Sequence, residues 1–383
     1  MKTDWLIVGT GLTGCVLAER IASILGEDVL MLESRSHVGG NVHDAFDSHG
    51  VYIHTYGPHL FHTNSELVWN YLSNFTAWRP HEHRVLAEIE STLVPVPFNY
   101  TSIDRLFVSS RATRLKEALT EHSGTSQQFT VSALRQHAAA EIRELGEYIY
   151  RRVFRDYTSK QWGVPAEQLD PSVLARVPVR ASYDDRYFTD RFQAIPANGY
   201  SSLVRNLLSS KRIHLMTSAD YFDVRAEIDA TFTIYTGPID RFFDYRDGAL
   251  AYRSLEFRYE HHRCERYQAA SQINYPDARP YTRTTEFKLI TGQTHAGTTV
   301  ATEFPVPHVV GRTEPYYPVP SDANQTLYER YRAMAAQLGD KVLFAGRLAD
   351  YRYYNMDQAV ARALMLFEKT VRPAHTARNA SCV

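Results

Sequence analysis

A glycine-rich turn near the start of the chain limits the possible folds more than any other feature. The residues GTGLTG at 9–14 follow the apolar run WLIV and precede CVLAERIASIL, which has a helical pattern. A strand, a tight glycine turn and a helix in this order are typical of dinucleotide-binding units. The first glycine makes the turn, the second lets the backbone approach a pyrophosphate, and the third lets helix and strand pack closely. We therefore predict a dinucleotide site at Gly9, Gly11 and Gly14.

Two later features indicate which dinucleotide is bound. Glu33 ends the next apolar strand, DVLMLE, about 20 residues after the turn, where a carboxylate can bind a ribose 2′-hydroxyl. An acid rather than an arginine at this place disfavours NADP. The pair Gly39 and Gly40 in SHVGGNV follows soon after, which is a feature of flavoproteins rather than of simple NAD dehydrogenases. The sequence therefore favours FAD over NAD.

Composition and charge exclude several classes of function. With 383 residues, 44% of them hydrophobic, the chain can bury a large core in two or three domains. A net charge of -1 provides no general basic surface, so a nucleic-acid partner is not expected. The three cysteines are widely scattered, which indicates a reducing compartment, and no apolar stretch approaches the roughly 18 residues of a membrane span. We predict a cytoplasmic protein that is not bound to a membrane.

The middle of the chain contains two regions with strand patterns and one with a helical pattern. Residues 82–101 form short alternating segments, in which Pro95 and Pro97 indicate an edge strand or a strand end. Between 244 and 319 the segments LEFRYEHH, EFKLIT and TTVATEF predict antiparallel hairpins. From 102 to 162 the apolar period is helical, and one stripe is expected to form core between packed helices: Val131, Leu134, Ala138, Ile142, Leu145, Ile149 and Val153.

The α/β pattern returns twice. IPANGYSSLVRNLLS and the strand-like TFTIYTGPID lie in mid-chain, and KVLFAG and the helical NMDQAVARALMLFEK lie near the end. Asn355 is expected to cap that last helix, with Gln358 as its partner in a capping box. The final VRPAHTARNASCV has no periodic pattern and is expected to be mobile. We predict one discontinuous nucleotide-binding domain that carries insertions.

Several stretches are rich in polar aromatic, arginine and histidine residues. YTSKQWG places Tyr157 and Trp162 beside two hydrogen-bond donors, which suits stacking on a nucleobase, although a partly buried aromatic pair at a helix end would look the same. Arg176, Arg180 and Arg283 could neutralise a diphosphate if they converge in space, whereas an isolated arginine is usually a surface residue. GPHLFHTN contains two histidines but suggests no third ligand, so a metal site is not expected.

Ten motifs, in this order, closely resemble UDP-galactopyranose mutases of the bacterial type. The resemblance covers the chain to about residue 368. A match in so many ordered motifs is far more specific than any one of them. The motifs are HVGGN, YGPHLFHTN, PVPFN, YTSKQWG, RVPVR, DDRYFTDRFQAIP, YTGPIDRFFDYRDGALAYRSL, PYTR, EPYYPV and GRLADYRYYNM.

The resemblance implies an α/β fold with three domains and a substrate cleft between them. The first is a discontinuous Rossmann-like FAD-binding domain, formed by residues 1–81, 197–243 and 320–370. The second is an inserted helical bundle at 102–172. The third is an antiparallel β-sheet domain that binds substrate, formed by 82–101, 173–196 and 244–319, and a mobile tail at 371–383 ends the chain.

The resemblance also implies an isomerase that interconverts pyranose and furanose forms of a sugar nucleotide, with UDP-galactose as the default substrate. Reduced FAD acts in this family as a nucleophile: its N5 displaces UDP from the anomeric carbon and forms a covalent flavin–sugar adduct, and the sugar ring closes again through O4. The reaction has no net redox change, so NAD(P)H or another reductant is needed only to prepare the flavin. A homodimer with a role in cell-wall or polysaccharide synthesis is expected.

The family's functional residues carry over to matching positions of this chain. The residues expected to be catalytic are Arg176, Arg283, His59 and His62, with Arg180 as a structural neighbour. Those expected to bind substrate are Tyr157, Trp162, Tyr187, Asn274, Tyr317, Tyr353 and His83. Those expected to bind the cofactor are Gly9, Gly11, Thr13, Gly14, Glu33, Ser34, Gly39, Gly40, Asn41, Gly346, Arg347, Asn355 and Met356.

The chain departs from the family pattern at three places. Asn355 and Asp357 stand where the family usually has an acid and a histidine, which changes the charge near flavin and sugar. Val153 and Asp156 precede YT where an aromatic residue and a glycine are common, and a smaller side chain there could make room for the methyl group of thymine. Pro58 and Ala345 replace small residues, a change that the fold should tolerate.

These departures leave the substrate open. UDP-N-acetylgalactosamine, UDP-arabinose and dTDP-fucose are alternatives to UDP-galactose. An amine-oxidase-like flavoprotein would share the glycine turn and Glu33 but would not need paired arginines. A third hypothesis is a protein that binds FAD or a nucleotide sugar without catalysis, which Asn355 makes conceivable.

Overall fold

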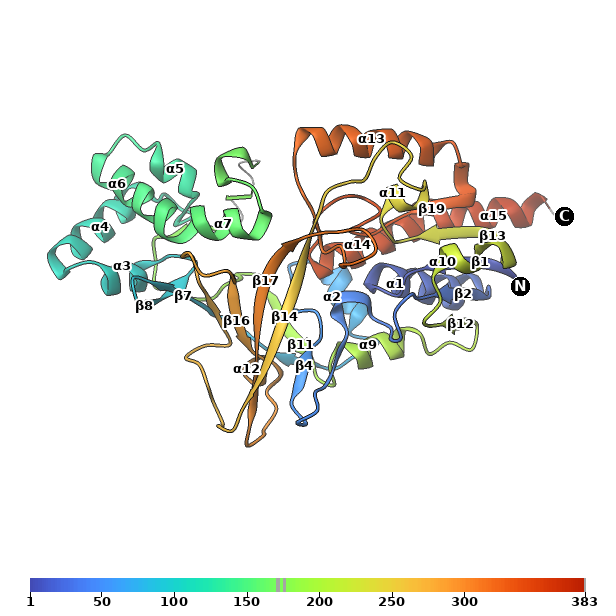
Figure 1. Ribbon diagram of the computed structural model, residues 1–383, viewed down its shortest axis with the longest axis horizontal. Coiled ribbons are helices and arrows are strands. Elements are labelled where there is room, and N and C mark those ends of the chain that lie inside the picture. The colour runs from blue at the N-terminus through green and yellow to red at the C-terminus, as the bar shows by residue number, and fades with distance from the viewer. Residues whose placement is uncertain (170–172, 175–176, 382–383) are drawn as a thin grey trace.

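The computed structural model describes residues 1–169, 173–174 and 177–381. A parallel sheet lies at one end of the molecule and a group of helices at the other (Figure 1). The long strands β14 (Tyr252–His262) and β17 (Thr298–Pro307) run between these two parts. The two chain termini lie on the side of the parallel sheet.

The parallel sheet has five strands that come from separate parts of the chain. The central strand, β1, lies beside β13, which is far from it in sequence. Every pair of neighbouring strands in the sheet is parallel. This arrangement confirms the α/β, Rossmann-like class. Across the sheet the strands are β12 (Ile213–Met216), β2 (Val29–Leu32), β1 (Lys2–Val8), β13 (Asp229–Tyr235) and β19 (Val342–Phe344).

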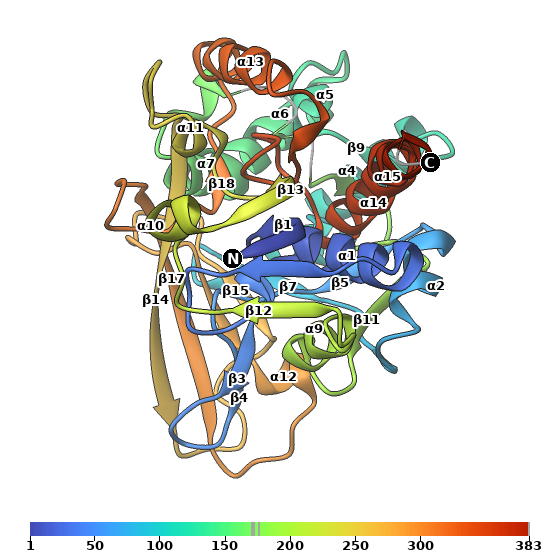
Figure 2. The same cartoon turned by 90° about the vertical axis from the view of Figure 1, so that its right-hand side faces the viewer.

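Apolar side chains cover both faces of this sheet. Trp5 and Ile7 of β1 face a core that includes the three helices on one side (Figure 2). Leu6 faces the opposite side, where it packs with residues at and after β12. Burial on both faces explains why β1 and β2 are continuous apolar runs rather than alternating ones. The three helices are α1 (Leu12–Arg20), α9 (Tyr200–Leu207) and α14 (Met356–Leu366).

A second sheet of seven strands forms the middle of the molecule. Its neighbouring strands are antiparallel, as expected, except that β15 and β7 are parallel. Pro95 lies in β8 at the edge of the sheet, which confirms the edge-strand interpretation. In order across the sheet the strands are β18 (Tyr317–Pro318), β14, β17, β16 (Arg283–Glu286), β15 (Gln272–Asn274), β7 (Val85–Ile89) and β8 (Thr92–Val96).

The prediction that EFKLIT is a strand was wrong. Only Glu286 of this segment continues β16, and α12 (Lys288–Thr291) is a short helix. The chain has to reverse direction between β16 and β17, which are antiparallel neighbours. Gly292, with a φ of 71°, ends the helical turn in the left-handed conformation that glycine adopts readily.

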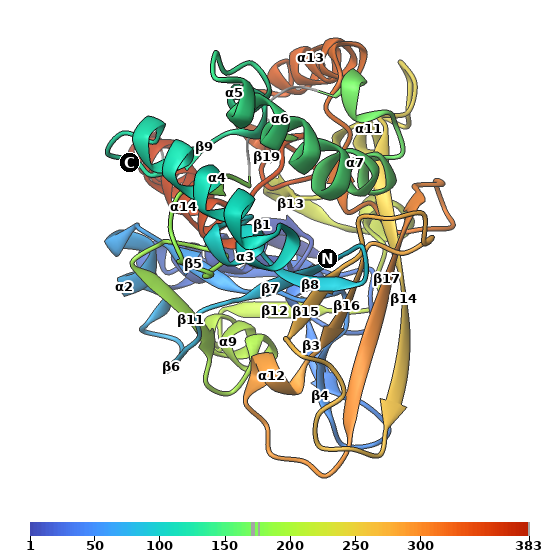
Figure 3. The same ribbon diagram turned by 90° about the vertical axis from the view of Figure 1, so that its left-hand side faces the viewer.

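The helices of residues 100–162 pack on β7 and β8, which contribute Val85 and Val96 to the same core (Figure 3). The expected apolar stripe is divided between two helices. Ala138 lies in the connection between them and is exposed, whereas the other six members of the stripe are buried. The helices are α3 (Tyr100–Leu106), α4 (Ser109–His122), α5 (Val131–Arg135), α6 (Ala140–Ile149) and α7 (Arg155–Trp162), with a π-helical turn at Tyr150–Phe154.

Shorter elements connect these parts. The further helices are α2 (Glu66–Leu72), α10 (Tyr221–Val224), α11 (Ile239–Phe242) and α13 (Asp322–Ala336). A three-stranded sheet contains β5 (Phe61–Thr63), β11 (Phe192–Pro196) and β6 (Trp78–Pro80). Two strand pairs are β3 (Asp44–Phe46) with β4 (Tyr52–His54), and β9 (Gln128–Phe129) with β10 (Val179–Arg180).

The end of the chain is helical rather than irregular, which corrects the expectation of a tail without structure at 371–383. A π-helical turn, Phe367–Val371, continues α14 and leads into α15 (Arg372–Ser381). His375 and Arg378 contact Glu27, at 2.7 and 3.3 Å, and Arg378 also pairs with Asp4. These contacts join the helix to the region of β1 and β2, a long-range interaction that the sequence pattern did not indicate.

Candidate functional site

A cavity of about 850 Å³ lies at the carboxyl ends of the parallel strands. Ligands of open α/β sheets bind at this edge, because the loops that follow the strands surround it. The cavity lining contains twelve of the thirteen residues expected to bind the cofactor, all except Gly14. They are Gly9, Gly11, Thr13, Glu33, Ser34, Gly39, Gly40, Asn41, Gly346, Arg347, Asn355 and Met356.

The glycines of the first turn have different surroundings. A Cβ atom on Gly14 would lie 2.1 Å from the carbonyl oxygen of Gly9, so this glycine allows α1 to pack closely against the turn. A Cβ atom on Gly11 would meet no protein atom within 4 Å, because Gly11 faces the cavity. Gly11 also precedes the first turn of α1, whose free N–H groups favour an anion. The turn therefore fits a dinucleotide pyrophosphate.

Glu33 is buried at the end of β2, where its carboxylate is held in place. Its Oε2 accepts hydrogen bonds from the backbone N–H and the hydroxyl of Thr10, at 3.0 and 2.6 Å. Its Oε1 accepts one from the backbone N–H of Arg35 at 3.0 Å. A carboxylate has about four acceptor positions, and the fourth partner, the Ser34 hydroxyl, lies at 3.5 Å, a long contact that a ribose hydroxyl could replace. The residues present thus fit the adenosine half of FAD.

A second cavity, of about 520 Å³, lies between the helical part and the seven-stranded sheet. Its lining contains every described residue that was expected to bind substrate and three of the four expected to be catalytic. They are Tyr157, Trp162, Tyr187, Asn274, Tyr317, Tyr353, His83, His59, His62 and Arg283. The fourth catalytic prediction, Arg176, lies outside the described residues.

The two cavities meet. His59, Tyr316, Arg347, Asn355 and Met356 line both of them. A group that extends from the glycine turn to this junction would therefore contact a molecule held in the second cavity. Arg347 is fixed at the junction, because its Nη2 donates to the carbonyl of Tyr354 at 2.7 Å.

Arg283 provides a positive charge inside the second cavity. Its Nε lies 3.0 Å from Oε1 of Glu303, directly across from it on β17, but is not aligned for a hydrogen bond. Its Nη2 donates to Oε1 of Gln161 at 3.4 Å. Burial alone would lower the pKa of the Arg283 guanidinium, but Glu303 and the tyrosines around it, Tyr157 first among them, together outweigh burial and raise that pKa. The guanidinium therefore stays charged and has donors available for an anion.

Sequence reasoning missed Glu303 and Gln161 as members of this cavity. Glu303 had a weak signal: it is an acid within the apolar strand TTVATEF, on the side that becomes buried. Gln161 is one of the two donors beside Trp162 in YTSKQWG, and its contact with Arg283 depends on how α7 meets β16. Neither contact follows from local pattern.

Aromatic rings form one wall of the second cavity. Tyr317 and Tyr353 stack with centroids 5.7 Å apart, and the Arg347 guanidinium lies over both rings, at 5.5 and 5.1 Å. Trp162 approaches Tyr317 at 6.4 Å. Burial and the charge of Glu303 raise the pKa of Tyr317 to about 12. Burial likewise raises the pKa of Tyr157, so both phenols remain protonated donors at neutral pH.

Two histidines of the cavity, His59 and His83, are neutral. Burial lowers the pKa of His59 to about 3, and the nearby His54 lowers it further. Burial also lowers the pKa of His83 to about 3, with a contribution from His81. His62 differs, since its Nδ1 lies 3.0 Å from Oδ2 of Asp190 and its ring stacks on a phenylalanine. Among the described residues, no group of three or more His, Cys, Asp or Glu could hold a metal ion.

Arg180 and Asp156 lie outside the second cavity. The buried Arg180 guanidinium donates to the backbone carbonyls of Asp184 and Tyr187, both at 3.3 Å, and so supports the segment that carries Tyr187. Asp156 faces a separate groove and pairs with its neighbour Arg155 at 2.7 Å. Val153, in contrast, lines the second cavity beside Tyr157.

The two departures near α14 have clear structural roles. Asn355 and Gln358 form the expected capping box, in which the Gln358 side chain accepts from the Asn355 backbone N–H at 3.0 Å. Asp357 accepts a hydrogen bond from the hydroxyl of Thr63 at 2.9 Å and so ties α14 to the end of β5. Pro58 lines the second cavity, and Ala345 is fully buried.

Comparisons with known proteins agree with this geometry. The family model described as UDP-galactopyranose mutase matches residues 152–353, and one described as an NAD(P)-binding Rossmann-like domain matches residues 7–75. A probable UDP-galactopyranose mutase of Klebsiella pneumoniae is 33% identical over 94% of this chain and 92% of its own length. The chain belongs to the UDP-galactopyranose mutase family.

Two further matches are a relative by sequence and a solved structure. The dTDP-fucopyranose mutase of Escherichia coli is 32% identical over 94% of this chain and 96% of its own length. A crystal structure of reduced UDP-galactopyranose mutase has a TM-score of 0.74 over 97% of this chain and 94% of that one, at 16% identity, which shows the fold alone. Membership in the UDP-galactopyranose mutase family makes this chain a flavin-dependent enzyme of the mutase class.

Among the described helices, none is both long enough and apolar enough to cross a bilayer.

Proposed function

We propose that this chain interconverts the pyranose and furanose forms of a nucleoside-diphosphate sugar with the help of reduced FAD. The observation that carries the proposal is the junction of the two cavities at His59, Arg347 and Asn355. A dinucleotide that starts at the glycine turn reaches the second cavity at this junction. The second cavity in turn holds the aromatic rings and the cation that a nucleotide sugar needs.

The nucleobase would bind at the end of the second cavity that α7 forms. Tyr157 and Trp162 offer flat rings for stacking there, and Asn274 offers an amide on the opposite wall. Val153 limits the cavity beside Tyr157, and its small side chain leaves more room than an aromatic one. This part of the cavity would therefore accept uracil and could also hold the larger thymine.

The diphosphate would lie against Arg283 and the tyrosines. Negative charge on the diphosphate grows as it leaves the anomeric carbon, so a cation and phenol donors stabilise the transition state more than the ground state. Arg283 remains charged, and Tyr317 remains a protonated donor near it, with the Tyr353 ring stacked on that of Tyr317. Arg176 is proposed as a second guanidinium by family resemblance alone, because it lies outside the described residues.

Reduced FAD, when bound, would supply the nucleophilic nitrogen that attacks the anomeric carbon, and the covalent route stays a prediction. Within the part of the chain that the structure describes, the side chains at the junction provide no obvious acid or base. His59 is neutral, with its Nδ1 2.8 Å from the carbonyl oxygen of Gly57, and Asn355 does not ionise. We propose that these side chains orient the sugar and exclude water.

The comparisons do not separate UDP-galactose from other sugar nucleotides, because relatives named for UDP-galactopyranose and dTDP-fucopyranose are 33% and 32% identical. The test is to reduce the protein with dithionite and supply the furanose forms of UDP-galactose, UDP-N-acetylgalactosamine, UDP-arabinose and dTDP-fucose in parallel. Chromatography then measures the pyranose product against an enzyme-free control. Absence of product with all four would contradict the proposal.

Two further measurements distinguish the remaining hypotheses. Binding of UDP without turnover after full reduction of the flavin would indicate a non-catalytic binding protein. Oxygen consumption with amines, unaffected by Arg283→Ala, would indicate an amine-oxidase-like flavoprotein. We also propose a homodimer, which sedimentation of the purified protein would test.

A further inference from the structure

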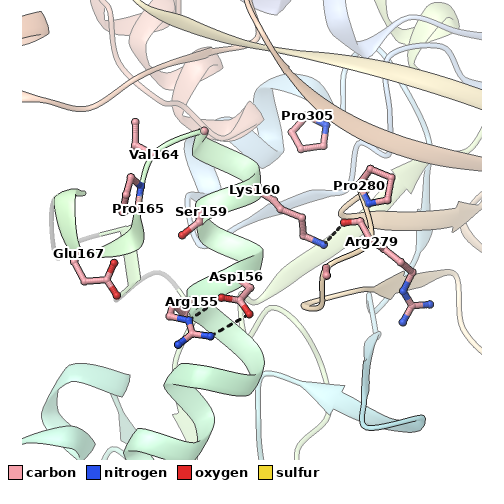
Figure 4. Close-up of a pocket in the computed structure, with 12 residues that line it drawn as sticks. Arg155, Asp156, Ser159, Lys160, Val164, Pro165, Glu167, Arg279, Pro280 and Pro305 are labelled. Atoms are coloured by element: carbon pink, nitrogen blue, oxygen red, sulfur yellow. Dashed lines mark hydrogen bonds and ion pairs between the residues drawn. The ribbon is translucent and has the colours of Figure 1, made fainter.

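Lys160 extends from α7 across a gap to the turn between β15 and β16. Its Nζ donates hydrogen bonds to three backbone carbonyl oxygens of that turn: Tyr275 at 2.6 Å, Arg279 at 2.9 Å and Tyr281 at 2.9 Å. Figure 4 shows the Lys160 side chain reaching from the helix to the carbonyl of Arg279. An ammonium group has three N–H donors, so all of them are used in this contact.

The turn that Lys160 holds joins two residues of the second cavity. β15 ends at Asn274 and β16 begins at Arg283, so the turn sets how far these two side chains extend into the cavity. The helix that carries Lys160 supplies Tyr157 and Trp162 to the same cavity. One ammonium group thus links the wall with the aromatic rings to the wall with the guanidinium.

We infer that Lys160 is a positioning residue for the nucleotide: it sets the distance between the aromatic wall on α7 and the wall formed by Asn274 and Arg283. Lys160 itself does not line the second cavity, so it acts through these neighbours. The inference deepens the proposed function and rests on it, because it assumes that the nucleotide lies between the two walls.

Two further contacts show that the end of α7 is held at a set place. Arg253 of β14 donates from Nε to the carbonyl of Gln161 at 3.0 Å and from Nη2 to the carbonyl of Lys160 at 3.3 Å. These bonds satisfy carbonyl groups that the helix end leaves without partners. The helix end is therefore fixed to β14 by Arg253, and Lys160 is the contact that adds the β15–β16 turn to this unit.

The charged side chains of the groove around Lys160 do not indicate a ligand site. Figure 4 shows one of the ion pairs in this groove, that of Arg155 with Asp156. Arg155 pairs with Asp156, and Arg279 pairs with Asp277 and with Glu88, the latter at 2.6 Å. Because these charges are already compensated, the groove is best explained as the space beside a structural link.

Lys288 provides a matched control for the test. Its Nζ also donates to three backbone carbonyls, those of Glu265, His295 and Gly297, and its side chain is buried. Lys288 begins α12 at the far end of β16 and lines neither described cavity. Removing either ammonium group should destabilise the fold, but only the loss of Lys160 should disturb the second cavity.

The experiment compares Lys160→Met, Lys288→Met and the wild-type protein, all in the flavin-bound form. We expect Lys160→Met to raise the Kd for UDP about tenfold or more, because small displacements of binding groups have large effects. Turnover at saturating substrate should fall less than kcat/KM. Lys288→Met should leave the Kd within about twofold of wild type, since substitutions away from a site have small effects on it. Equal Kd values for all three proteins, or equal losses in both variants, would overturn the inference.

Hydrogen exchange of the ligand-free protein gives a second readout that does not depend on nucleotide binding. Lys160→Met should speed the exchange of backbone amides in residues 275–282, and Lys288→Met should not. Unchanged exchange in that turn would overturn the inference about Lys160. Failure of the wild-type protein to bind either UDP or dTDP would instead count against the proposed function alone. If Lys160→Met does not fold, Lys160→Gln, which keeps two N–H donors, takes its place with a smaller expected effect.

Discussion

The pair of Arg283 and Glu303 determines the charge of the second cavity. The two residues are cross-strand neighbours on β16 and β17, and the buried carboxylate keeps the guanidinium charged. A buried pair of this kind is costly to break, because the remaining charge loses its partner. The pair therefore serves stability and anion binding together, and a mutation of either residue has to be interpreted with both roles in mind.

Replacement of Arg283 should lower the catalytic activity by more than any loss of folded protein accounts for. Arg283→Lys keeps a positive charge beside Glu303 but loses the two-pronged guanidinium, so we expect kcat/KM to fall by about 10²-fold, or about 2.7 kcal/mol of transition-state stabilisation. Steady-state assays of the reduced protein measure this effect. Arg258→Lys, on the exposed side of β14, is the control and should stay within about twofold. Similar losses in both variants would contradict a specific role for Arg283.

The buried histidines should make the protein sensitive to acid. Burial lowers the pKa values of His54, His59 and His83 from 6.5 to about 3. Between these values the unfolded chain takes up protons that the folded protein excludes. The stability that depends on these histidines being neutral is therefore fully present above about pH 6.5 and is lost progressively as the pH falls towards 3.

The variant His54→Asn tests this prediction. Asparagine can still accept the hydrogen bond that the His59 backbone N–H donates to Nδ1 of His54 at 3.0 Å, but it does not titrate. Between pH 6.5 and pH 5, the free energy of unfolding should fall by about 1.5 to 2 kcal/mol less in the variant than in wild type. Urea unfolding at the two pH values measures the difference. Identical slopes would show that His54 is not neutral in the folded protein.

At the scale of elements, the junction of β1 and α1 depends on two glycines with different roles. Gly14 lies where α1 touches the turn, and Gly11 lies where the turn faces the cavity. The sequence spacing alone made them equivalent members of one motif. From the atoms around each Cβ position we infer a packing role for Gly14 and a ligand-binding role for Gly11.

Alanine at these two positions should therefore have different effects. Gly14→Ala places a methyl group 2.1 Å from the Gly9 carbonyl oxygen, so we expect the flavin-free protein to lose about 1 to 3 kcal/mol of stability. Gly11→Ala meets open space and should leave that stability within about 0.5 kcal/mol of wild type, while it weakens FAD binding. Chemical denaturation of the apoprotein and flavin titration measure the two effects. A stable Gly14→Ala apoprotein would argue against the packing role.

At the scale of the whole molecule, the dinucleotide cavity is closed by a segment from another part of the chain. Residues 308 and 310–316, between β17 and β18, line it together with the end of β2. Nη2 of Arg35 pairs with Oε2 of Glu314 at 2.9 Å, and the Arg35 guanidinium lies over the ring of Tyr56. The pair is partly exposed, since the Glu314 side chain is 55% accessible, so its contribution should be small.

Loss of this pair should speed the release of flavin. We expect Glu314→Gln to raise the dissociation rate of FAD by about twofold to fivefold at low salt, with a smaller effect at about 1 M salt, because a partly exposed ion pair is screened. The increase in flavin fluorescence on release measures the rate. Glu329→Gln removes a surface pair on α13 and serves as the control. An effect that is independent of salt would indicate a cause other than the ion pair.

Local pattern predicted the elements that have a strong period or a clear end signal. The glycine turn with β1, α1 and β2, the pair β7 and β8, and the capping box of α14 were all predicted correctly. Elements with weak signals were not. The pattern predicted a strand where α12 forms and a mobile tail where α15 forms, and the contacts of α15 with Glu27 and Asp4 join residues more than 340 positions apart.

The sequence by itself determined the dinucleotide turn, because its glycines and Glu33 are close along the chain and act through local backbone geometry. It also contained the ten motifs by which the mutase family is recognised. Only the tertiary structure decided how these parts meet: that Glu303 faces Arg283, that Lys160 spans to the β15–β16 turn, and that the two cavities join at Arg347. Such contacts link residues more than a hundred positions apart or on different strands, and their geometry depends on packing that no local pattern records.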